Sequence, residues 1–143
     1  MTGGFKHLSH TADVLIEAWG DSIEEAFEYA ALGVFEVMTN TSLVKPEEEK
    51  RIEVEGGDLE SLLYNWIEKL LILFDTEQIL FSKFKVEKIE KKEEIFKLYG
   101  IAAGEQYSGE KHESRTLVKA VTYHLMEISS KNSKVVVRFV VDI

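Results

Sequence analysis

An apolar repeat with helical spacing occupies residues 23–38 and limits how this chain can fold more than any other feature does. Its apolar positions are Ile23, Ala26, Phe27, Ala30, Ala31, Val34, Phe35 and Met38. Intervals of three and four residues place these side chains along one face of an α-helix, whereas a strand requires alternation. Ser22 stands three residues before Glu25, which is the arrangement of a capping box at a helix N-terminus. The sequence therefore predicts a helix over 23–38 with one buried face.

A second helical repeat covers residues 59–74 and has a wider apolar face. Asp58 is placed to cap its N-terminus. The apolar positions are Leu59, Leu62, Leu63, Trp66, Ile67, Leu70, Leu71 and Phe74. Because a stripe of this width buries more than one side of a helix, we expect this helix to be sandwiched between other elements.

Segments with strand character fill most of the remaining chain. They are residues 14–20, 51–55, 79–92, 93–104, 116–129 and 133–143. The third and fourth alternate across a charged turn, as in an antiparallel hairpin, and SKNS is a turn candidate between the last two. The order βαβαββββ predicts an α+β fold, with two helices packed on a largely antiparallel sheet of about six strands. Since no repeat or linker interrupts its 143 residues, we expect residues 1–143 to form a single domain.

The charge and composition exclude several classes of function. The formal net charge is −9, and the basic residues alternate with glutamates, as in KFKVEKIEKKEEIFK, so no basic stripe is available for a phosphate backbone. We therefore expect no direct stable binding to nucleic acid. The sequence contains no cysteine, no secretory signal and no apolar run near the roughly 20 residues of a membrane helix. A cytoplasmic protein without a membrane association is expected.

Four polar residues inside the strand patterns are candidates for a functional site. Asp13 begins one apolar strand and Asp142 ends another, next to the terminal carboxylate of Ile143. In LVKAVTYHLM, Lys119 shares one face with Leu117, Val121 and Tyr123, and His124 falls on the opposite face.

Each candidate also has a purely structural interpretation. An aspartate at a strand end is commonly a turn or cap residue, a strand lysine extends to solvent, and a single histidine is commonly a hydrogen-bonded structural residue. His7 and His112 lie in polar stretches and receive no role. The glycine-containing segments lack the spacing of a phosphate loop, and no nucleophile elbow or paired-histidine motif is present.

The order of the motifs resembles that of the archease family. HTADVLIEAWG is followed by the capped helix SIEEAFEYAALGVFEVM, then by LVKAVTYH and by a terminal VVVRFVVDI. Each motif is short, but together with an Asp-Ile carboxyl terminus they span nearly the whole chain. The stretch 76–112 contributes least to the resemblance.

The resemblance implies an accessory protein of the GTP-dependent tRNA-splicing RNA ligase, which joins a 3′-phosphate or 2′,3′-cyclic phosphate end to a 5′-hydroxyl. Such a protein promotes guanylylation and multiple turnover of the ligase, so it is not an enzyme and has no catalytic residues of its own. By the same resemblance, Asp13 and Asp142, with the carboxylate of Ile143, bind a divalent cation. Lys119 matches a residue needed for activation, and His10 and His124 lie within the same motifs.

The chemistry of this ligand set favours a hard ion. Converging carboxylates repel one another unless a cation or a lysine neutralises them, and oxygen ligands suit calcium or magnesium in preference to zinc. Two other functions remain open from the sequence. One is a metal-dependent phosphoesterase with His124 as its base, and the other is a general chaperone or adaptor.

Overall fold

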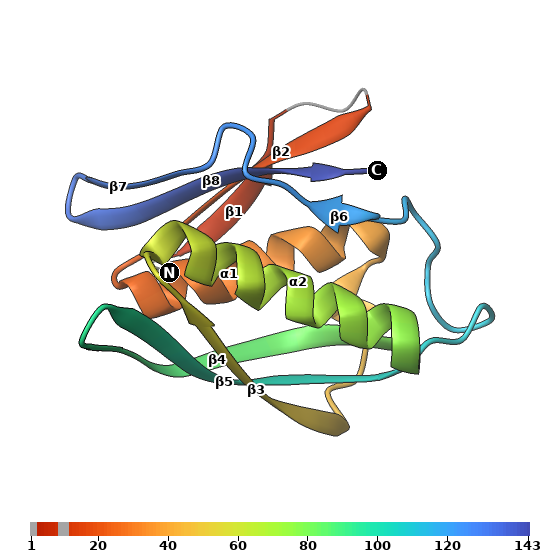
Figure 1. Ribbon diagram of the computed structural model, residues 1–143. Coiled ribbons are helices and arrows are strands. Elements are labelled where there is room, and N and C mark those ends of the chain that lie inside the picture. Colours follow the sequence, from red (N-terminus) through yellow and green to blue (C-terminus); the bar gives the residue numbers. More distant parts are fainter. Residues whose placement is uncertain (1–2, 9–11) are drawn as a thin grey trace.

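The computed structural model describes residues 3–8 and 12–143 and shows an α+β fold in three layers (Figure 1). Helices α1 (Ile23–Met38) and α2 (Leu59–Glu77) lie between a five-stranded and a three-stranded sheet. The predicted fold class is confirmed, and α2 is sandwiched as its wide apolar stripe indicates. The single predicted sheet is divided into two, one on each side of the helices.

The five-stranded sheet combines strands from the N-terminal and C-terminal parts of the chain. Its strands are β1 (Gly4–His7), β2 (Asp13–Gly20), β6 (Ala120–Val121), β7 (Glu127–Lys131) and β8 (Lys134–Asp142). Strand β8 pairs along one edge with β2 and along the other with β6 and β7, and every pairing is antiparallel. The last strand is thus central, and β6 and β7 form an outer edge.

The three-stranded sheet follows the predicted hairpin. It consists of β3 (Glu48–Gly56), β4 (Ile79–Lys92) and β5 (Ile95–Gln106), in the order β3-β5-β4, again antiparallel. The turn between β4 and β5 places Glu93 in the left-handed region, at a φ of 60°. A short 3-10 helix, η1 (Thr41–Leu43), connects α1 to this sheet.

Side chains at the helix ends explain where both helices begin. The Ser22 hydroxyl accepts from the Glu25 amide at 3.1 Å, while the Glu25 carboxylate binds the Asp21 amide instead of completing the box on Ser22. Asp58 and Ser61 form a full capping box at the start of α2. Inside the core, Trp66 of α2 is fully buried and donates from Nε1 to the Phe27 carbonyl of α1 at 3.0 Å, which ties the two helices together.

Two differences from the prediction account for the eight strands found among the described residues, where about six are expected. Strand β1 has only four residues and one large apolar side chain, too little for a recognisable alternation. The strand predicted over 116–129 is interrupted, since Leu125 takes a φ of 55° in a turn that separates β6 from β7. Neither helix in the described part of the chain has both the length and the apolar character needed to cross a bilayer.

Candidate functional site

The ends of β2 and β8 bring the two candidate aspartates together. Asp13 and Asp142 are direct partners in the antiparallel register, and the next pair is Val14 with Val141. Both valines are buried against the helices, so the aspartates share the opposite, outer face of the sheet. Directly opposed residues have Cβ atoms about 4.5–5.5 Å apart, close enough for both carboxylates to bind one ion.

Ile143, the third predicted ligand, lies at the same end of the sheet. Its side chain packs against the hydrophobic core, and its amide lies 3.5 Å from the Ala12 carbonyl. The terminal carboxylate therefore belongs to a residue that is fixed on both its side-chain and main-chain sides. This is the physical basis on which Ile143 could contribute an oxygen beside Asp13 and Asp142.

The electrostatics of this pair suit a cation. Like charges directly opposite each other destabilise a sheet, and neither aspartate side chain forms an ion pair or hydrogen bond with another described residue. Within residues 3–8 and 12–143 no three His, Cys, Asp or Glu side chains gather into a metal-binding group, and the pair itself supplies two carboxylates. The donor set is then all oxygen, which suits calcium or magnesium.

The structure brings Lys119 to the site through its main chain. Its amide donates to the Asp142 carbonyl at 2.8 Å, and Ala120 is the direct partner of Asp142 in β6. The Lys119 side chain is exposed and lines a groove between this segment and α2. The predicted common face of Lys119 with Leu117, Val121 and Tyr123 is not formed, because Val121 is buried while the other three are exposed. Within 117–124, regular strand geometry covers only Ala120–Val121.

The described candidate histidine, His124, is not brought to the aspartate pair. His124 is exposed in the turn after β6, where its amide binds the Thr122 hydroxyl at 3.2 Å. Thr122 pairs with the Val140 carbonyl, so this turn lies further along β8, roughly 7 Å or more from Asp142 at about 3.4 Å per residue. His124 is therefore poorly placed to act as a base there. His10 lies outside the described residues.

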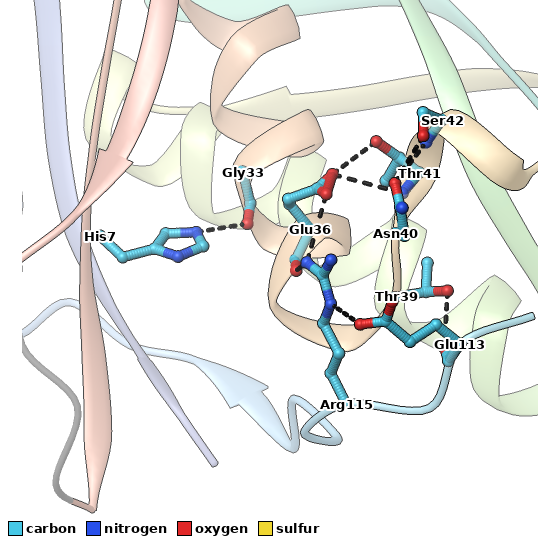
Figure 2. A network of polar contacts seen from close by, with 9 residues as sticks. All are labelled: His7, Gly33, Glu36, Thr39, Asn40, Thr41, Ser42, Glu113 and Arg115. Carbon is cyan, nitrogen blue, oxygen red and sulfur yellow. Dashed lines mark hydrogen bonds and ion pairs between the residues drawn. The ribbon is translucent and has the colours of Figure 1, made fainter.

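An arginine that the sequence analysis did not single out fixes the chain leading to Lys119. Figure 2 shows Arg115 reaching the Glu36 side chain and carbonyl and the Glu113 carboxylate. The amides of Arg115 and Thr116 donate to the carbonyls of Met38 and Val37 at 3.0 and 3.2 Å. These bonds attach the irregular segment to the C-terminal end of α1, whose last carbonyls otherwise lack partners.

A cavity of about 300 Å³ lies beside the start of β2 and the end of β8, on the helix side of the sheet. Val14 and Ile143 line it together with His7, Glu36 and Arg115. His7 Nε2 lies 3.0 Å from the Gly33 carbonyl of α1, as Figure 2 shows. The aspartate pair and this polar cavity thus occupy opposite faces of the same sheet end.

His112, which received no role from the sequence, holds the start of the same irregular segment. Its ring is buried, with Nδ1 accepting from the Ser108 amide and Nε2 donating to Glu105, both at 2.9 Å. Burial of Glu105 acts to raise its pKa, but hydrogen bonds from Lys111, His112 and the Lys45 amide outweigh burial and hold the pKa at about 2. No pattern in the polar stretch 103–115 reveals this cluster.

Comparisons with known proteins identify the family of this chain. Residues 5–143 match the model of the Archease protein family (MTH1598/TM1083). The chain is 51% identical to protein archease of Sulfurisphaera tokodaii over 139 residues, which cover 97% of this chain and 98% of the relative.

Two solved structures share the fold. The solution structure of Methanobacterium thermoautotrophicum protein 1598 is 48% identical, with a TM-score of 0.86 over 98% of this chain and 99% of that one. A crystal structure of a Thermotoga maritima archease is 22% identical, with a TM-score of 0.60 over 96% of both chains, and supports the fold alone. The full-length family match and the 51% identity of a curated relative show that this chain belongs to the archease family.

Proposed function

We propose that this protein is an accessory activator of the GTP-dependent tRNA-splicing RNA ligase. It promotes guanylylation of the ligase and multiple turnover, and performs no reaction of its own. The observation that carries this proposal is the direct pairing of Asp13 with Asp142 at the end of the five-stranded sheet. A like-charged pair at this position is a cost to folding unless it has a ligand to bind.

Asp13, Asp142 and the carboxylate of Ile143 are the residues that would hold a divalent cation, calcium or magnesium. Such an ion keeps coordination positions beyond those three oxygens, and these are suited to phosphate oxygens in the nucleotide pocket of the ligase. Lys119 supplies a positive charge beside this end of the sheet, and its main chain is held by the Asp142 carbonyl. The protein's part is to position these groups against the ligase.

The partner in this proposal is the ligase protein and not RNA. The formal net charge of −9 opposes contact with a phosphate backbone and favours a basic protein surface. A cytoplasmic location, where the ligase meets its substrates, belongs to the same proposal.

Multiple-turnover ligation by the cognate ligase tests the function directly. RNA with a 2′,3′-cyclic phosphate end and a 5′-hydroxyl end is supplied in excess over ligase, with GTP, a divalent cation, and with or without this protein. We expect ligation to stop near one turnover without the protein and to continue with it. Equal product with and without it would contradict the proposal.

A general chaperone role is a second candidate. The Thermotoga maritima relative is described as a possible chaperone, and this chain exposes large apolar side chains along residues 117–125. Suppression of aggregation of unrelated proteins, with no effect on ligation, would favour this role over the first.

A further inference from the structure

Exposed apolar side chains gather along one segment of the surface. Leu117, Tyr123 and Leu125 are 59%, 54% and 59% exposed, and all three lie within one stretch of nine residues. Ile72 of α2 is 47% exposed, whereas Leu71 and Leu73 on either side of it in the sequence are buried. Single exposed apolar residues are ordinary on a protein surface, but a cluster beside a hollow indicates an interaction site.

The hollow is a groove of about 550 Å³ between the C-terminal half of α2 and residues 117–121. Tyr64, Glu68 and Ile72 follow one another at four-residue intervals and so lie along one face of α2. At its N-terminal end this seam is closed, because the rings of Tyr64 and Tyr123 stack with centroids 4.4 Å apart. Beyond Glu68 the seam opens, with Ile72 and Leu117 lining the groove.

The charges around the groove select the kind of partner. Glu68 and Asp75 line it on the α2 side, and neither forms an ion pair with another residue in the described ranges. Helix α2 as a whole carries four acidic residues and one lysine. A segment with apolar side chains for the groove and lysine or arginine beside them would complement this surface. A second copy of this chain, itself at −9, would bring acidic residues against acidic residues.

The groove adjoins the Asp13–Asp142 pair through the main chain of Lys119 and Ala120. Its wall includes Lys119 and Ala120, and these residues are held against Asp142 by the Lys119 amide and by the β6–β8 register. A segment lying in the groove would therefore place the rest of its own protein next to the aspartate pair.

On the basis of the proposed function, we infer that this groove is the docking site for a segment of the RNA ligase that combines apolar side chains with a flanking basic residue. The carboxylates of Asp13, Asp142 and Ile143 act on the ligase, and the groove fixes the position of the two proteins relative to each other. Affinity and stimulation are then separable properties, the first set mainly by Ile72 and Leu117 and the second by Asp13 and Asp142.

Binding of the cognate ligase to full-length variants tests this inference by biolayer interferometry, alongside the turnover assay. Ile72→Glu and Leu117→Glu should each weaken binding about tenfold or more, yet still stimulate when the variant is supplied in large excess. Ile95→Glu is the matched control, because Ile95 is 44% exposed but lies at the β4–β5 turn, and it should bind as the wild type does. Asp75→Lys should weaken binding and reduce its dependence on salt.

Three results would overturn the inference, and they differ from one another. If the wild type binds and stimulates but Ile72→Glu and Leu117→Glu bind equally well, the groove is not the docking site and the proposed function stands. If sedimentation shows a wild-type dimer that Ile72→Glu dissociates, the occupant is a second copy. If the wild type neither binds nor stimulates the ligase, the proposed function is wrong, and the ligase is not the partner that docks in the groove.

Discussion

In the three-stranded sheet Glu90 lies directly opposite Lys97, whereas in the five-stranded sheet Asp13 lies directly opposite Asp142. Glu105, near the end of β5 in the three-stranded sheet, also has partners for its carboxylate. It receives hydrogen bonds from Lys111, His112 and the Lys45 amide. The five-stranded sheet also pairs Glu17 with Arg138, at 2.7 Å, so the opposed aspartates at its end are the exception to this pattern. This contrast is the physical argument for proposing that the aspartate pair serves a ligand and not stability.

Removing either aspartate should have the largest effect. Asp13→Ala and Asp142→Ala are each expected to abolish stimulation of the ligase, because one carboxylate fewer leaves the cation too weakly held. Multiple-turnover ligation measures the loss, and circular dichroism should show an unchanged fold, since both side chains lie outside the core. Full stimulation by either variant would remove the aspartates from the site.

Extending the chain beyond Ile143 should weaken the cation site without touching a side chain. A short Gly-Ser extension converts the terminal carboxylate into a peptide carbonyl, which removes one negative charge from the ligand set. We expect calcium affinity to fall by about tenfold or more, since each 1.4 kcal/mol is a factor of ten. An extension at the N-terminus is the control, and equal calcium affinity for both proteins would exclude Ile143 as a ligand.

Lys119 should affect activation more than metal binding. Lys119→Ala is expected to reduce stimulation several-fold and to leave calcium affinity nearly unchanged, because the main-chain bond to Asp142 survives while the ammonium group is lost. Lys83→Ala, on the other sheet, serves as the control. A parallel loss of calcium affinity would show that Lys119 acts by holding the metal site together.

The hydrogen-bonded carboxylate of Glu105, in the three-stranded sheet, should change how the free energy of unfolding depends on pH in the acidic range. The pKa of Glu105, about 2, lies below the usual 4.5, so its contribution to stability is fully present above about pH 5 and is lost as the pH falls toward 2. Glu105→Gln should lower the free energy of unfolding at neutral pH by about 1–3 kcal/mol and flatten its decline over this range. Thermal melting from pH 7 to pH 2 measures both, and parallel melting curves for variant and wild type would contradict this account.

The smallest expected effect is a change in the free energy of unfolding that has opposite signs for a carboxylate removed from each sheet. Without divalent cations, Asp142→Asn removes a repulsion and should raise the free energy of unfolding by about 0.2–1 kcal/mol, whereas Glu90→Gln removes an attraction and should lower it by a similar amount. Urea unfolding in the presence of a chelator measures both variants. A loss of stability in Asp142→Asn would mean that the pair is not repulsive.

Local patterns predicted local elements well. The bounds of α1 and of β4 agree with their apolar periodicity, since both depend on side chains close together in sequence. The division into two sheets was not predictable, because it depends on which distant strands pair. Leu125 interrupts the expected strand by taking a left-handed conformation that is unusual for a leucine, and no residue type marks it in the sequence.

The candidate site was predictable to the extent that it lies at strand ends. Asp13 and Asp142 interrupt apolar strands, and the family resemblance relates them to each other. Arg115 and His112 were missed because their contacts reach to α1 and to β5 from a polar segment without periodicity.

Calcium titration of the full-length protein tests the central claim most directly. Isothermal titration calorimetry should show one calcium ion per wild-type chain and no binding to the Asp13→Asn/Asp142→Asn double variant. A wild-type chain that binds no divalent cation, or a double variant that binds it equally well, would contradict the account.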